Sequence, residues 1–75
     1  MNEPVQIYVA LLDEGVDVWR PIKAELVQGD TYRIVSQPYD RTLEAWQFEP
    51  GERVICKLID SNEGQILAAV QRAVP

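Results

Sequence analysis

Three groups of side chains in this sequence could take part in chemistry. The first is Asp13, Glu14 and Asp17, which gather carboxylates around one glycine-containing turn. Carboxylate oxygens are the ligands that calcium prefers, but this loop lacks the spacing and the ligand number of a recognised calcium-binding motif, and the sequence contains no histidine. We therefore interpret the group as a solvated turn whose charge is partly balanced by Arg20, and we predict no metal site.

The second group is a set of glutamates beside two aromatic residues. Glu44, Glu49 and Glu52 flank Trp46 and Phe48. Paired carboxylates can act as general acid and base when their surroundings separate their pKa values. No feature of the sequence predicts a cleft around them. We interpret these side chains as a polar rim around two core aromatic residues.

The third candidate is Cys56, the only cysteine. A nucleophilic thiol needs a base that favours the thiolate, and the chain has no histidine to supply one. Cys56 is in phase with Val54 and Leu58, which predicts a buried thiol that packs as a small apolar group. The sequence also has no cofactor-binding fingerprint, so we predict a protein that is not an enzyme and binds no cofactor.

The two tryptophans differ in their phase along the predicted strands. Trp46 shares a face with Phe48, which predicts a core position. Trp19 is out of phase with Val16 and Val18, so it is either a core residue or a stacking surface for a ligand. The candidate partner-binding residues are therefore Asp13, Glu14, Asp17, Trp19 and Arg20.

Short alternating segments separated by turns must position these side chains. Alternation of apolar and polar residues predicts strands over residues 5–12, 16–27, 31–36, 45–48 and 53–60. The predicted turns contain Gly15, Gly29, Gly51 and Gly64. Pro21 has no amide hydrogen and is expected to mark a bend, bulge or edge in the second strand. Residues 37–44 are predicted to form the longest loop.

The stretch from Gln65 to Val74 fits two kinds of element. Ile66 and Val70 are compatible with strand alternation, and together with Val74 they also fit one face of a helix. The strand is favoured because a small barrel needs a partner for its open edge. The sequence therefore predicts one all-β domain over residues 1–75, a small SH3-like barrel or roll of five to six antiparallel strands.

Composition limits the range of functions. Twelve acidic residues against seven basic ones give a net charge of -5, and the basic residues are scattered, so we expect no nucleic-acid binding. No apolar run approaches the ~20 residues of a membrane-spanning helix. The single cysteine and the absence of a basic, signal-like N-terminal segment favour a cytoplasmic protein. A chain of 75 residues has a thin core, and we expect a monomer or a weak homodimer.

Three segments, residues 11–21, 32–34 and 46–54, carry a resemblance. Together they resemble a group of short bacterial proteins that share an LLDEG-x-DVWRPV-like stretch, a central Y-x-I strand and a later W-x-F-x-PG-x-x-V stretch. Ile22 stands where valine is common in the group. The group has no established activity, so the resemblance implies a small, stand-alone bacterial protein and transfers no site residue.

Two functions remain open from the sequence. The leading hypothesis is a non-catalytic interaction module that binds another protein through an edge strand or an aromatic groove. The alternative is an acidic inhibitor or immunity-type protein that covers a basic surface of an enzyme. Salt should weaken binding steeply in the second case and much less in the first.

Overall fold

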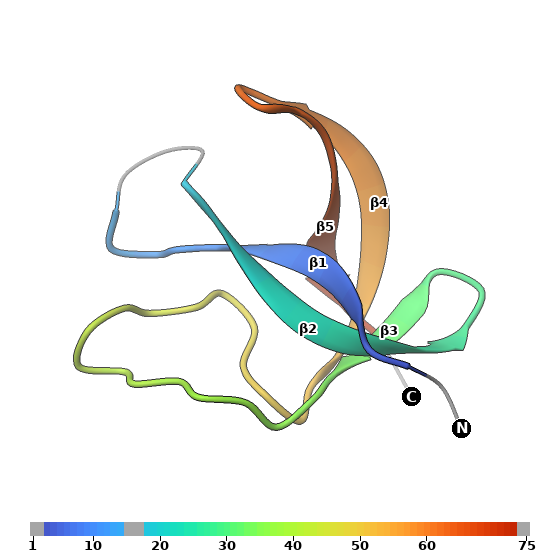
Figure 1. The fold of residues 1–75 in the computed structure, drawn as a ribbon, viewed down its shortest axis with the longest axis horizontal. Helices are drawn as coiled ribbons and strands as arrows, with labels where there is room; N and C mark the ends of the chain where they lie inside the picture. Colours follow the sequence, from blue (N-terminus) through green and yellow to red (C-terminus); the bar gives the residue numbers. More distant parts are fainter. Residues whose placement is uncertain (1–2, 15–17, 74–75) are drawn as a thin grey trace.

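A closed barrel of five strands forms the molecule (Figure 1). A computed structural model describes residues 3–14 and 18–73. Their strands are β1 (Val5–Ala10), β2 (Trp19–Gln28), β3 (Thr31–Ile34), β4 (Arg53–Ser61) and β5 (Gly64–Arg72). The predicted all-β fold is confirmed, and the described residues contain no helix, so the ambiguous last element is a strand. The turn predicted at Gly15 lies outside the described residues, as does Asp17.

Pairing between strands is mostly antiparallel. Each strand pairs with the next along the chain in antiparallel fashion, as predicted. The barrel closes by a parallel contact between β1 and β5, with Tyr8 opposite Ala68 as its register pair. This parallel seam was not predicted, and it is the shortest pairing in the barrel.

The long strand β2 tolerates Pro21 within its ladder. Pro21 lies opposite Tyr8 of β1, while β2 pairs with β3 only from Ala24 onward. The amide of Lys23 points toward the β3 side, where it donates to Gln37 Oε1, and strand residues two apart point their amides the same way. The nitrogen of Pro21 therefore faces a side without a strand partner, and its missing hydrogen breaks no ladder bond.

The long connection between β3 and β4 covers one end of the barrel. Trp46 and Phe48 are buried there, at 4% and 5% exposure, and join the main core cluster. The predicted strand over residues 45–48 is wrong, because this segment forms only a single bridge between Leu11 and Trp46. Its backbone is still held on the barrel, since the amide of Gln47 donates to the carbonyl of Ala10 at 2.9 Å.

The β4–β5 hairpin extends beyond the core. Cys56 is buried at 3% exposure, as predicted, but Leu58 on the same strand face is 65% exposed. Leu58 lies opposite Leu67 in the outer part of the hairpin, which rises away from the rest of the barrel in Figure 1. The strand phase that predicts a buried Cys56 therefore does not imply a buried Leu58. Leu58 lies on the same face of β4 as Cys56, but no core residues among those described pack against that face in the outer part of the hairpin.

Candidate functional site

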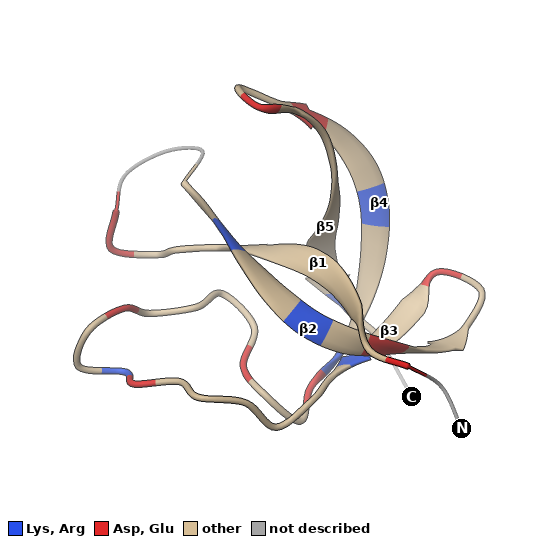
Figure 2. Cartoon of the chain, viewed as in Figure 1, with Lys and Arg blue, Asp and Glu red and all other residues tan. Residues whose placement is uncertain are grey.

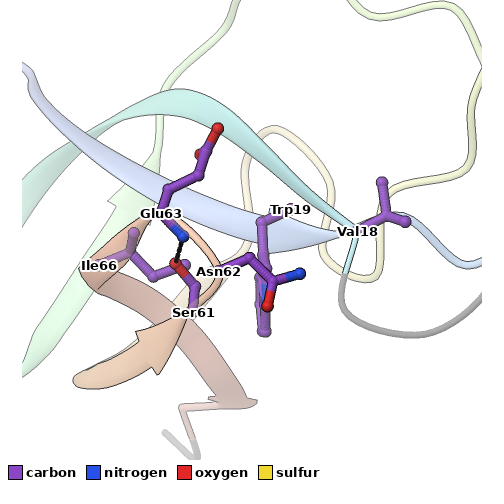
Figure 3. Close-up of a pocket in the computed structure, with 6 residues that line it drawn as sticks. All are labelled: Val18, Trp19, Ser61, Asn62, Glu63 and Ile66. Carbon is purple, nitrogen blue, oxygen red and sulfur yellow. Dashed lines mark hydrogen bonds between the residues drawn. The ribbon is translucent and has the colours of Figure 1, made fainter.

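The two candidate binding residues on β2, Trp19 and Arg20, lie on opposite faces of the strand. Arg20 lies opposite Val9 in the β1–β2 ladder, whereas Trp19 lies opposite Ala10. Val9 is fully buried in the core, so Arg20 starts on the core side of the sheet and Trp19 on the outer side. Figure 3 shows the alternation directly, because the side chains of Val18 and Trp19 point in opposite directions. The sequence brought Trp19 and Arg20 together in one candidate site, and the structure separates them.

Trp19 lines a hollow on the outer side of the barrel, which we call the Trp19 groove. The groove lies between the start of β2 and the turn that joins β4 to β5 (Figure 3), and its volume is about 240 Å³. It is lined by Val18, Trp19, Ser61, Asn62, Glu63 and Ile66.

The turn that forms one wall of the groove is well fixed. The Ser61 hydroxyl donates to the carbonyl of Gly64 at 2.7 Å and accepts the amide of Glu63 at 3.1 Å. Gly64 has a φ of 101°, a conformation that side-chain-bearing residues rarely adopt. These two hydrogen bonds hold the turn in its conformation, and the side chains of Asn62 and Glu63 extend from it.

Polar groups in the groove remain available to a ligand. Trp19 is half-buried, and its indole N–H makes no hydrogen bond to any of the described residues. The same holds for the side-chain amide of Asn62 within this part of the chain. Both groups can therefore bond to water in the free protein and to a polar ligand group in a complex.

Arg20 belongs to the opposite side of the sheet. Its Nε lies 3.3 Å from Glu44 Oε1, and the same carboxylate oxygen accepts the Trp46 indole N–H at 2.6 Å. We predicted that Arg20 balances the acidic turn at Asp13, which is wrong for the described acids of that turn. Strand alternation turns Arg20 toward the long loop, where it pairs with the Glu44 carboxylate that accepts the Trp46 N–H.

The glutamates near Trp46 form the predicted polar rim. Glu49 accepts the hydroxyl of Tyr39 at 2.9 Å and pairs with Arg41. Hydrogen bonds from Arg41 and then from Tyr39 lower the pKa of Glu49 below its usual value. The Tyr39 ring also packs on Trp46, with ring centroids 4.3 Å apart. These groups stabilise the loop, and the geometry provides no acid–base pair.

Cys56 is structural. Burial, with a smaller contribution from the charge of Asp30, raises the pKa of its thiol to about 11. The thiol is therefore protonated at neutral pH and is a poor nucleophile.

Gln37 is a structural residue that sequence reasoning missed. Its side-chain amide accepts the Lys23 amide hydrogen at 3.0 Å and donates to the Lys23 carbonyl at 2.8 Å. One side chain thus occupies the edge of β2 where β3 has ended, as a neighbouring strand would. A lone glutamine in a loop gives no sequence signal for this role.

Beyond Ile55, the edge of β4 that faces β3 has no strand partner in the described part of the chain. β3 pairs with β4 as far as Ile55, and the last backbone bond across is from the Cys56 amide to the Asp30 carbonyl at 2.9 Å. By alternation, the backbone groups of Leu58 and Asp60 face the same way and extend beyond β3. Lys57 lies within this edge, and charged residues there discourage pairing with other strands.

Charges are distributed unevenly over the molecule (Figure 2). The ion pairs of the described residues are Arg20–Glu44, Arg33–Glu25, Arg41–Glu49 and Arg72–Glu52. Other carboxylates have no basic partner in that part of the chain. They include Asp13 and Glu14 after β1, and Asp60 and Glu63 at the β4–β5 turn. The β4–β5 turn that lines the Trp19 groove thus carries negative charge that no described basic residue pairs with.

Comparisons with known proteins give no further guide to the site: no family model matches the chain, and no curated protein and no solved structure matches it. Residues 3–14 and 18–73 contain no group of three or more side chains that could hold a metal ion. They also contain no helix of the length and apolar character needed to cross a membrane.

Proposed function

We propose that this protein is a non-catalytic interaction module that binds a segment of another protein in the Trp19 groove. The observation that carries the proposal is the position of Trp19, which is half-buried in a concave site and whose indole N–H bonds to none of the described residues. Tryptophan combines a large apolar surface with a hydrogen-bond donor and is enriched among the residues that dominate binding energy at interfaces. A net charge of -5 favours a protein partner over a nucleic acid.

The groove is a better binding route than an edge strand. Gln37 already occupies the edge of β2, and the free edge of β4 is short and contains Lys57. Strand addition to that edge would rest on the backbone of Leu58 and Asp60 alone. The groove offers more, because it combines an aromatic ring, polar groups that bond to none of the described residues, and a hydrogen-bonded turn as one wall.

An acidic inhibitor that covers a basic enzyme surface is the second candidate. The unpaired carboxylates of Asp13 and Glu14, exposed after β1, support it. Under either hypothesis, we propose a cytoplasmic protein that is a monomer or a weak homodimer. Under the inhibitor hypothesis, raising the salt concentration should slow association steeply, because long-range charge attraction is screened.

Peptide selection followed by NMR tests the binding site. Peptides selected from a random library on the intact protein are titrated into ¹⁵N-labelled protein. We expect the largest shifts at the Trp19 indole and at the amides of Ser61 and Glu63. Trp19→Ala should abolish binding, whereas Leu43→Ala, a change at an 82% exposed residue on the loop side, should not. Shifts confined to Leu58 and Asp60 would instead indicate strand addition and contradict the proposal.

A further inference from the structure

We infer that the Trp19 groove takes the cationic side chain of an extended basic segment, an arginine or a lysine of the partner protein. The inference rests on the proposed function and names the chemistry of the occupant. It follows from the charges around the groove, from the Trp19 ring in its lining, and from the hydrogen-bonding groups beside it that bond to none of the described residues.

The charges around the groove favour a cation. Glu63 lines the groove and has no basic partner in the described part of the chain. Asp60 precedes the same turn and is likewise unpaired. Lys23 and Lys57 are the described lysines, and neither lines the groove. An incoming cation would therefore meet negative charge that the protein itself does not neutralise.

The ring of Trp19 suits a cation in its own right. Tryptophan is the strongest of the aromatic side chains in attracting a cation to its face. The chain already uses this contact elsewhere, since the guanidinium of Arg72 lies 5.6 Å from the centroid of the Phe48 ring. In the groove, the corresponding cation is missing from the described residues, and a partner can supply it.

The polar groups beside the ring suit an extended backbone. The Trp19 N–H is a donor without an acceptor among residues 3–14 and 18–73, and the Asn62 amide can both donate and accept. A peptide in extended conformation offers carbonyl and N–H groups to both. A purely apolar occupant would instead bury these groups and Glu63 without partners, which costs binding energy.

The test uses three short peptides that differ at one kind of position. The probe is acetyl-Gly-Arg-Gly-Arg-Gly-amide, compared with the same peptide carrying citrulline, a neutral isostere, or glutamate in place of arginine. Binding is followed by the Trp19 indole resonance at low salt. We expect the arginine peptide to bind at least ~10-fold more tightly than the citrulline peptide, and a lysine version to bind like arginine.

A matched pair of variants separates local from overall charge. Glu63→Gln removes one charge from the groove, and Glu3→Gln removes the same charge from the exposed N-terminal segment. Glu63→Gln should weaken the arginine peptide about 3- to 10-fold, whereas Glu3→Gln should change its affinity less than about 2-fold. Equal effects of the two variants would show that only net charge matters and would overturn the inference.

The outcomes also separate the inference from the proposed function. Equal binding of the arginine and citrulline peptides in the groove would overturn the inference and leave the groove as a binding site. Library peptides that bind there without any basic residue would do the same. If no selected peptide and no basic peptide moves the Trp19 resonance, both the inference and the proposed function are wrong.

Discussion

The two tryptophans of this small barrel are used in opposite ways. Trp46 is 4% exposed, packs against Tyr39 and donates its indole N–H to Glu44. Trp19 is half-buried and bonds to none of the described residues. The indole N–H of Trp46 is satisfied within the fold, whereas Trp19 lines a groove and its N–H bonds to no residue in the described part of the chain. A residue type alone therefore does not mark a binding site, and its unsatisfied groups are the better guide.

The charges show the same division. On the side of the long loop, Arg20 and Arg41 are paired with glutamates that also bond to aromatic residues. On the groove side, the described carboxylates have no basic partners. The loop side therefore uses its polar groups for stability, whereas the groove side leaves them free for binding.

Replacing each tryptophan in turn should give the largest effects on stability and tests the comparison directly. Trp46→Ala should lower the free energy of unfolding by about 3–5 kcal/mol, because it leaves a large cavity in a thin core. Trp19→Ala should cost less, about 1–3 kcal/mol, since its ring is partly in water already. Urea denaturation measures both values. Equal losses would show that Trp19 is a core residue and would remove the basis of the groove.

Substitution of Cys56 tests whether the first part of β4 belongs to the core. Cys56→Ser should cost about 1–3 kcal/mol, because it buries a hydroxyl without an assigned partner. The raised pKa of the thiol, about 11 against a usual 9.0, also predicts pH dependence. The unfolded chain ionises first, so the stability contribution is complete below pH 9 and is lost as the pH rises toward 11. Alkylation at neutral pH as fast as in denaturant would contradict this assignment.

Glu44 tests whether the loop side depends on its polar contacts. Glu44→Ala should cost about 1–2 kcal/mol, because the Trp46 N–H loses its acceptor. Glu44→Gln keeps an acceptor oxygen and should cost less. Arg20→Ala, which removes only a partly exposed ion pair, should cost less than about 1 kcal/mol. A ranking in which Arg20→Ala is the most damaging would show that the ion pair, and not the indole bond, holds the loop.

Leu58 should give the smallest effect. Leu58→Ser should change the free energy of unfolding by no more than about 0.5 kcal/mol, because the side chain is 65% exposed on the outer hairpin. Thermal or urea unfolding measures the difference. A loss comparable to that of Cys56→Ser would show that the outer hairpin shares the core.

Strand phase could be predicted from the sequence wherever a core lies beneath the strand. Alternation placed Trp46 and Cys56 correctly, and the turn glycines Gly51 and Gly64 adopt positive φ values. Leu58 shows where this reasoning ends, because phase identifies a strand face but not how far the core extends. The separation of Trp19 from Arg20 follows from the same alternation and could have been predicted from their adjacency.

Long-range contacts could not be predicted in this way. The parallel seam at Tyr8 and Ala68 depends on how the whole sheet curves, and one residue pair has no local pattern. The Gln37 side chain bonds to the backbone of β2 in place of a neighbouring strand, and the two segments meet only in the folded barrel. The side chains of Arg20 and Glu44 also meet only in the folded barrel. Each of these contacts joins segments that are far apart in the sequence and share no local pattern.

The most direct test of the account compares the two tryptophans in one experiment. Protein labelled with 5-fluorotryptophan should give two ¹⁹F resonances, assigned through Trp19→Phe. We predict that the acetyl-Gly-Arg-Gly-Arg-Gly-amide peptide shifts the Trp19 resonance and leaves Trp46 unchanged, and that a soluble paramagnetic probe broadens Trp19 alone. A shift of Trp46 with Trp19 unmoved would contradict the assignment of Trp19 as the binding tryptophan.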